Sequence, residues 1–210
     1  MEVLAWYRRI APSYDAVCRP LYGATRRAAL RALEAGPGER VLDLCCGTGL
    51  SLTALAHAVG VTGRVVGVDG SPQMLARARR RAAATPQVHL LEADLREDQG
   101  DRLLAAAAAP AFDALHVGLT LAVVDDWQEV FARAWALLRP GGRCVVWDTR
   151  PLRGLWRPCN PLVVPLAGWT GRADLRRPTW TVLDGRAEQL AVRHRLGGYL
   201  YIACGRRPSA

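Results

Sequence analysis

The feature that most constrains the fold is the stretch 40–69, where two short apolar segments flank a turn with two glycines and a helical pattern. Residues 40–44 predict a strand, 45–49 a tight turn, and 50–58 a helix. A second predicted strand, 64–68, ends at Asp69. Glycines let the backbone approach a ligand closely, and a carboxylate after the second strand can accept hydrogen bonds from a ribose diol. The segment therefore predicts an α/β unit that binds a nucleotide-like ligand.

The turn differs from a dinucleotide-binding loop. Such a loop reads G-x-G-x-x-G and holds a pyrophosphate, but Leu52 stands at the third small position. In addition, Asp43 precedes Gly47 by four residues. A carboxylate there would repel a pyrophosphate and suits a ligand with an ammonium group, which argues against a nicotinamide-dependent oxidoreductase. S-adenosylmethionine has an ammonium, a sulfonium and a ribose but no phosphate. The D-x-x-x-G-x-G arrangement followed by Asp69 resembles the class I (Rossmann-like) methyltransferases, which use this cofactor.

The remaining sequence continues the alternation of strands and helices. Further strands are predicted at 88–95, 112–118 and 142–148, and a helix from Trp127 to Leu138 that a Pro-Gly-Gly turn terminates. A short helix at 180–185 and a strand pair, 187–196 and 199–204, complete the chain. We predict an α/β fold with a Rossmann-like, seven-stranded, mostly parallel sheet, an antiparallel C-terminal strand and flanking helices. Its single domain divides into an N-terminal helical lid (1–39), a cofactor-binding core (40–148), a substrate lid (149–179) and a strand pair that completes the sheet (180–210).

The resemblance implies which residues contact the cofactor. An acid after strand three receives the adenine amino group in such enzymes, and the next backbone N–H meets a ring nitrogen, which maps to Asp94 and Leu95. The full set of implied cofactor contacts is Tyr14, Asp43, Cys45, Gly47, Thr48, Gly49, Asp69, Gly70, Met74, Asp94, Leu95 and His116. His116 and Asp148, at the ends of strands four and five, are the candidate catalytic bases, although either could instead serve packing. The six cysteines contain no C-x-x-C pair, so no metal site is expected.

Both ends of the chain resemble one subgroup. Residues 6–15 are similar to the F-x-x-I-A-x-x-Y-D motif of the UbiE-like methyltransferases, and 197–205 to the G-G-Y-x-Y-I-A-x-G ending of that group and of bacterial phospholipid N-methyltransferases. The resemblance implies a small-molecule or lipid acceptor. An amine-bearing phospholipid is favoured. A quinone precursor or a natural product remains an alternative, as does a relative that binds the cofactor without methylating.

The segment 149–178 is rich in proline, which predicts irregular structure, and its apolar middle, 160–169, is flanked by arginines. It could cover a pocket, contact an anionic membrane or form a dimer interface, and the oligomeric state stays open. The net charge is +9 and every one of the 28 basic residues is arginine, yet no nucleic-acid-binding motif is present, so nucleic acid is not an expected partner. With no secretory signal or membrane span visible, we expect a cytoplasmic protein that contacts the membrane peripherally at most.

Overall fold

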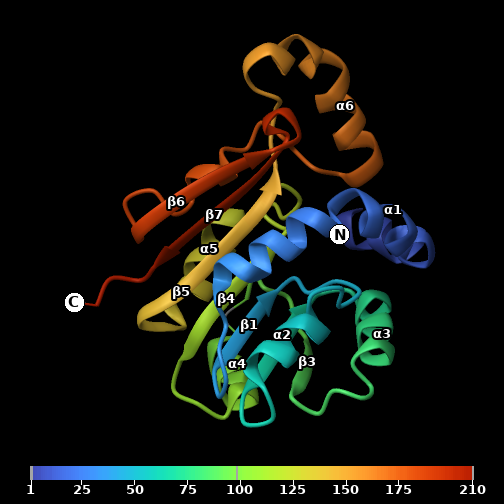
Figure 1. Cartoon of the computed structure of the whole chain (residues 1–210). Coiled ribbons are helices and arrows are strands. Elements are labelled where there is room, and N and C mark those ends of the chain that lie inside the picture. The colour runs from blue at the N-terminus through green and yellow to red at the C-terminus, as the bar shows by residue number, and fades with distance from the viewer. Residues whose placement is uncertain (1, 98, 210) are drawn as a thin grey trace.

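The computed structural model describes the backbone of residues 2–97 and 99–209, and the side chains of residues 15, 16, 18–97 and 99–209. Within these residues a seven-stranded sheet is covered by helices on both faces (Figure 1). The strands are β1 (Arg40–Leu44), β2 (Arg64–Asp69), β3 (Val88–Glu92), β4 (Phe112–Gly118), β5 (Leu138–Thr149), β6 (Glu188–Arg195) and β7 (Leu200–Arg206). The α-helices are α1 (Glu2–Leu33), α2 (Leu52–Val59), α3 (Pro72–Arg81), α4 (Gly100–Ala107), α5 (Trp127–Ala136) and α6 (Asn160–Gly171).

The order of the strands across the sheet is β3-β2-β1-β4-β5-β7-β6. The first five strands are parallel, β7 runs antiparallel to β5, and β6 runs antiparallel to β7. This confirms the predicted fold class. The order reverses between β1 and β4, and ligands of doubly wound sheets bind beyond the carboxyl ends of the strands at such a point.

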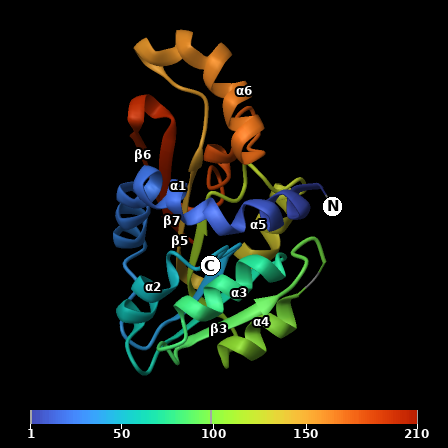
Figure 2. The same cartoon turned by 90° about the vertical axis from the view of Figure 1, so that its right-hand side faces the viewer.

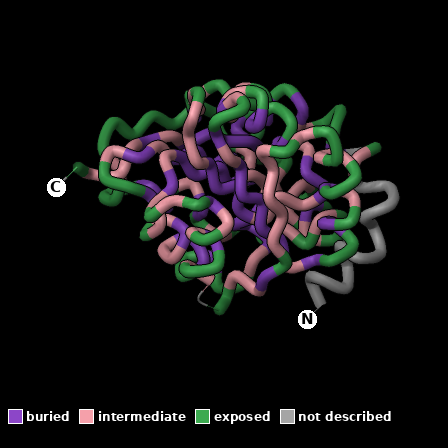
Figure 3. Tube along the Cα trace, turned by 90° about the horizontal axis from the view of Figure 1, so that it is seen from below, coloured by how far each residue is buried: buried purple, intermediate pink, exposed green. Residues whose placement is uncertain are grey.

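The core has one layer on each face of the sheet because neighbouring strand residues point to opposite faces. Leu42 and Leu44 of β1 pack with Phe131 of α5, whereas Val41 packs with Leu33 of α1 and Leu55 of α2 on the other face. Both layers are buried, and Figure 3 shows buried residues running through the centre of the molecule. The inner strands therefore read as nearly continuous apolar segments, which is why the sequence pattern located them.

Several boundaries differ from the sequence prediction. Within the N-terminal region 1–39, α1 ends at Leu33, and β3 ends at Glu92, three residues earlier than predicted. α5 ends at Ala136, two residues before the predicted end, and the Pro-Gly-Gly segment does not terminate it but lies within β5, where the pairing with β4 is irregular. The predicted helix at 180–185 is instead a 3-10 helix, η2 (Thr179–Thr181), followed by turns.

The expectation of irregular structure at 149–178 is wrong for half of that segment. A 3-10 helix, η1 (Gly154–Cys159), leads into α6. Pro161 stands in the first turn of α6, where an absent N–H breaks no hydrogen bond, so only Pro165 interrupts the helix interior. Figures 1 and 2 show α6 at the end of the molecule toward which β5 points. No helix among the described residues is long and apolar enough to cross a membrane.

Candidate functional site

The glycine turn predicted from the sequence connects β1 to α2 at the carboxyl edge of the sheet. Gly47 and Gly49 adopt φ angles of 56° and 79°, in the left-handed region that glycine enters without strain. A Cβ on Gly49 would lie 2.7 Å from Leu52 Cδ1 and 3.1 Å from the Cα of Ala78. The second glycine is therefore required both by the backbone turn and by the close approach of α3 to the loop.

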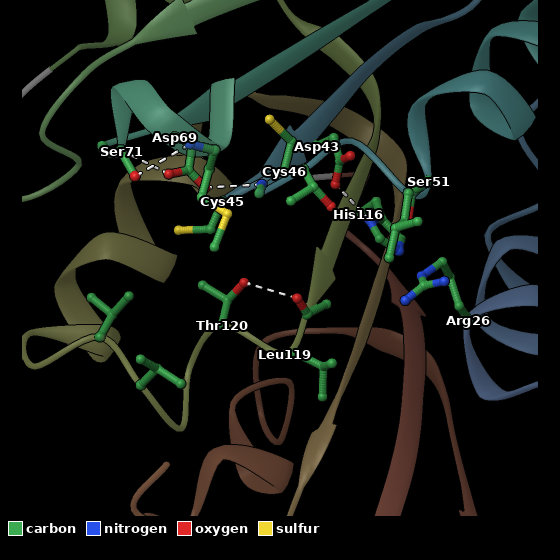
Figure 4. A pocket seen from close by; sticks show the side chains of 18 of the residues that line it. Arg26, Asp43, Cys45, Cys46, Ser51, Asp69, Ser71, His116, Leu119 and Thr120 are labelled. Atoms are coloured by element: carbon green, nitrogen blue, oxygen red, sulfur yellow. Dashed lines mark hydrogen bonds and ion pairs between the residues drawn. The ribbon is translucent and has the colours of Figure 1, made fainter. Parts of the chain in front are cut away.

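Two adjoining cavities of about 140 and 420 Å³ lie beyond this turn and share Cys45, Gly70, Val123 and Val124. Taken together, the two cavities have the volume of a small-molecule cleft. Figure 4 shows the first cavity, with Asp69 and Ser71 on one side and Asp43 and His116 on the other. Of the predicted contacts, the following line at least one of the two cavities: Asp43, Cys45, Gly47, Thr48, Asp69, Gly70, Met74, Asp94, Leu95 and His116. Gly49 shapes the turn behind them, and the side chain of Tyr14 lies outside the described residues.

Asp69 connects the turn to the start of α3. Its Oδ2 accepts a hydrogen bond from the N–H of Gly47 at 2.9 Å, and its Oδ1 accepts one from the N–H of Ser71 at 2.8 Å. Burial raises the pKa of Asp69 to about 6, although these two hydrogen bonds oppose the shift. Each carboxylate oxygen retains a lone pair, so Asp69 can still accept hydrogen bonds from a ligand in the cavity.

Asp43, His116 and Trp147 form a buried chain across three adjacent strands. Asp43 Oδ1 lies 2.6 Å from His116 Nδ1, and the indole N–H of Trp147 donates to His116 Nε2 at 3.0 Å. An indole nitrogen can only donate, so Nε2 must carry a lone pair and the neutral imidazole carries its proton on Nδ1. His116 therefore donates to Asp43, and both of its ring nitrogens are engaged.

The second oxygen of Asp43 has no hydrogen-bond partner within the described structure, although it is buried. Three other buried side-chain atoms share this state, on Arg40, Gln87 and Arg150, but none of those residues lines either cavity. A buried carboxylate oxygen without a donor costs free energy, which a cationic ligand group could recover. This atom marks where the cavity can receive a positive charge.

The far end of the cleft contains Asp94 and Leu95, which follow β3. Arg96 makes a two-pronged contact with the Asp94 carboxylate, with Nε to Oδ1 at 2.9 Å and Nη2 to Oδ2 at 2.5 Å. The side-chain hydrogen bonds from Arg96 lower the pKa of Asp94 despite some burial. Asp94 is thus ionised and held in place at the rim of the second cavity.

Asp148 is placed differently from the other candidates. It is only 1% exposed, does not line either cavity, and its oxygens accept from the N–H groups of Ala122 and Thr149. Burial raises its pKa to about 6, and the hydrogen bonds oppose the rise. Its visible role is to fasten the loop after β4 to β5. A catalytic role for Asp148 stays a prediction, as does one for His116, whose Nε2 lone pair is occupied.

Sequence reasoning missed several residues that line the first cavity, among them Arg26, Ser71, Leu119, Thr120 and Trp147. Arg26 lies on α1 with its guanidinium carbon 5.8 Å from the centre of the Trp147 ring. Leu119 has a φ of 55°, a strained value for a residue with a Cβ, directly after β4. Residues that follow a predicted strand could have been suspected from topology, whereas the placement of Arg26 depends on how α1 crosses the sheet.

A latch between α1 and the glycine turn was also not foreseen. Asp15 accepts a hydrogen bond from Thr48 Oγ1 at 2.6 Å and forms an ion pair with Arg81 at 2.7 Å. Arg81 also donates to the carbonyl of Thr48. Burial opposes ionisation of Asp15, but the hydrogen bonds from Thr48 and Arg81 outweigh it and lower the pKa. These contacts connect α1, the turn and the end of α3.

Comparison with known proteins finds sequence similarity to methyltransferases. Residues 41–142 match the family model described as a methyltransferase domain. A 2-phytyl-1,4-naphtoquinone methyltransferase from Thermosynechococcus vestitus is 37% identical over 151 residues, covering 70% of this chain and 64% of the relative. A demethylmenaquinone methyltransferase from Desulfitobacterium hafniense is 35% identical over 156 residues, covering 70% and 60%. The chain thus spans somewhat less than two thirds of the length of these relatives.

Solved structures agree in fold. The N-methyltransferase NodS from Bradyrhizobium japonicum, in complex with S-adenosyl-l-homocysteine, superposes with a TM-score of 0.72 at 18% identity, covering 99% of this chain and 100% of that chain. A methyltransferase from Aquifex aeolicus, described as dependent on S-adenosylmethionine, gives a TM-score of 0.62 at 14% identity, covering 87% and 89%. At such identities the likeness establishes the Rossmann-like fold.

Proposed function

We propose that this chain transfers a methyl group from S-adenosylmethionine to a quinone precursor, since residues 41–142 match the methyltransferase-domain model. The unpartnered Oδ2 of Asp43 supports the first half of this proposal, and the names of the two quinone methyltransferases support the second. S-adenosylmethionine supplies an electrophilic methyl group on a sulfonium, so the protein's task is to bind, orient and exclude water.

The residues of the cleft fit this cofactor. Asp43 Oδ2 would accept a charge-assisted hydrogen bond from the ammonium group, which satisfies the orphaned oxygen. His116 keeps the carboxylate oriented through Oδ1, and Trp147 holds His116 in the tautomer that donates to it. Asp69 would receive the ribose hydroxyls, and Asp94 with Leu95 would hold the adenine edge. Burial and the nearby carboxylates raise the pKa of Cys45 and Cys46 well above the ordinary value, so both remain neutral thiols beside the ligand.

The quinone acceptor is preferred to the phospholipid that the chain ends had suggested. Neither of the two relatives described above is named for a phospholipid. Methylation of a ring carbon requires loss of a proton, and among the described residues that line the first cavity His116 is the one imidazole. It could accept a proton at Nε2 only after the hydrogen bond from Trp147 is released. Otherwise the proton is taken up by water, or by the acceptor's own oxygen when the acceptor binds in its ionised form.

The test is a methyl-transfer assay with S-adenosylmethionine labelled on the methyl group. A reduced demethylmenaquinone with a short side chain and a total polar-lipid extract are offered as separate acceptors. We expect label in the quinone fraction and an equal amount of S-adenosylhomocysteine. Label in a polar-lipid band instead would replace the quinone by a phospholipid. Cofactor binding without any S-adenosylhomocysteine would identify a relative that does not methylate and would refute the proposed reaction.

Cofactor binding is tested separately by calorimetry on Asp43→Asn. Asparagine keeps an oxygen for His116 but removes the charge that the ammonium would meet. Loss of a charged hydrogen bond of about 1.5–3 kcal/mol raises the Kd for S-adenosylmethionine about 10- to 150-fold. Asp101→Asn removes an exposed carboxylate at the start of α4 that lines neither cavity, and should change the Kd by less than about twofold. Equal affinities of both variants would show that Asp43 does not hold the ammonium.

A further inference from the structure

One end of the molecule presents large apolar side chains to solvent. Leu155 and Trp156 of η1 are 97% and 60% exposed, and Leu162 and Trp169 of α6 are 73% and 76% exposed. Leu166 of α6 and Leu196, in the short 3-10 helix η3 (Leu196–Gly198), are also exposed. We call these six residues the apolar surface. η1 packs against both α6 and η3, so the three elements form a continuous region.

The exposed face of α6 is regular. Leu162, Leu166 and Trp169 are spaced i, i+4 and i+7, which places them on one side of the helix, while Ala167 is buried on the other. A helix that is apolar on all sides normally lies in a core or in lipid. With twelve residues α6 is too short to span a bilayer but has the length of an interfacial segment.

Charge decides which partner suits this surface. Residues 149–173 contain four arginines, at 150, 153, 157 and 172, and no acidic residue. If a second copy of the chain docked on the same surface across a twofold axis, it would bring these arginines together, which is unfavourable. An anionic bilayer instead attracts arginine and accommodates tryptophan at the level of its headgroups.

We propose that the apolar surface on η1, α6 and η3 docks the protein on an anionic membrane. Leu162, Leu166 and Trp169 enter the headgroup region of the bilayer, and the flanking arginines contact the lipid phosphates. The purpose of this docking rests on the proposed function, because a quinone precursor with a long hydrocarbon tail resides in the bilayer.

The inner side of α6 borders a cavity that lies next to the cofactor cleft. A cavity of about 580 Å³ lies between Val164, Pro165 and Gly168 of α6 and the segment 172–177. It reaches Val123, which also lines both cavities of the cleft. An acceptor head leaving the bilayer beneath α6 would therefore pass Val123 on its way to the methyl group.

Docking is tested without cofactor or acceptor, by cosedimentation with vesicles. One vesicle is pure phosphatidylcholine, and the other contains equal parts of phosphatidylcholine and phosphatidylglycerol. We expect binding to the mixed vesicles that weakens with salt, and weak binding to the neutral ones. Lack of binding to the mixed vesicles would overturn the proposal. Because no methyl transfer is measured, a failure of docking and a failure of the proposed reaction are told apart.

Variants locate the surface. The double variant Leu162→Glu/Trp169→Glu should lower the partition coefficient about tenfold or more, since two anchors are lost and two anions are added. Val61→Glu, at a residue 90% exposed in the turn before β2, is the matched control and should bind like the unaltered protein. Arg157→Gln should lower the partition coefficient about fivefold. Arg80→Gln, at an exposed residue of α3, should leave it unchanged. Equal loss in the control variants would overturn the assignment of the surface.

A measurement that needs no charged variant complements this one. Brominated lipids quench tryptophans that enter the bilayer, so the unaltered protein should be quenched and Trp156→Phe/Trp169→Phe much less so. Sedimentation equilibrium without lipid tests the other occupant. A dimer that the Leu162→Glu/Trp169→Glu change dissociates would assign the surface to a second copy and refute membrane docking.

Discussion

Replacement of Gly118, the last residue of β4, most directly tests the buried hydrogen bonds that connect Asp43, His116 and Trp147. A Cβ at this position would lie 2.4 Å from Trp147 Nε1, 2.6 Å from Cε2 and 2.8 Å from Cζ2. The indole of Gly118→Ala must therefore move away and give up its hydrogen bond to His116. Overpacking costs about 1–3 kcal/mol, and a buried acceptor left without a donor costs a similar amount. Because the two costs share one cause, we expect a total of about 2–4 kcal/mol.

The assay is urea unfolding followed by circular dichroism, because fluorescence would change with the tryptophan itself. A loss of about 2–4 kcal/mol corresponds to a melting temperature lower by about 5–15 °C in a chain of this size. Gly171→Ala is the matched control: apart from its neighbours in the chain and the adjacent backbone of α6, no atom lies within 4 Å of its Cβ position, and its φ is not in the left-handed region. It should change the free energy of unfolding by less than about 0.5 kcal/mol.

A double-mutant cycle identifies the cause. Trp147→Phe alone removes the N–H donor and should cost about 1–3 kcal/mol. In that background Gly118→Ala no longer meets Nε1 and has no hydrogen bond left to break. The double variant should therefore be more stable than the sum of the two costs predicts, by about 1–2 kcal/mol. Additive costs, or a Gly118→Ala variant as stable as the unaltered protein, would refute the described placement of the indole.

Three further outcomes are expected. Burial raises the pKa of Asp69 to about 6, so protonation below that pH weakens its ability to accept hydrogen bonds. The Kd for S-adenosylmethionine, measured by calorimetry, should therefore rise up to about tenfold from pH 7 to 5. Asp69→Asn should flatten this dependence of the Kd on pH. Burial also raises the pKa of Asp148 to about 6, so this carboxyl takes up its proton at a higher pH in the folded state than in the unfolded state. Its protonation therefore stabilises the folded state as the pH falls from about 7 to 4. Asp148→Asn should reduce this dependence of the melting temperature on pH, and an unchanged dependence would count against the assignment. Asp15→Ala removes the contacts of the latch with Thr48 and Arg81, so amide hydrogen exchange in the described part of α1 should accelerate about fivefold. Unchanged exchange would show that these contacts do not stabilise α1.

Local pattern was sufficient to predict the sheet and most of the cleft. Parallel strands buried on both faces are apolar throughout, and the residues that follow them meet at one edge by topology alone. Asp43, Gly47 and Asp69 could therefore be assigned to one site from their positions along the chain, and the first cavity, which all three line, confirms that they lie together. The positive φ angles at Gly47 and Gly49 agree with the tight turn predicted at 45–49.

The sequence by itself thus determined the succession of strands and helices along the chain, the glycine turn and the acids at the strand ends, because each depends on residues close together in the chain. Only the tertiary structure decided what those acids contact. The pairing of Asp43 with His116 joins residues 73 apart, and the Asp15 latch reaches across 33 residues to Thr48 and 66 to Arg81. Likewise, Leu162 and Trp169 of α6 are exposed to solvent, and composition cannot distinguish that outcome from burial. Contacts of this kind depend on how distant elements pack, which no local pattern encodes.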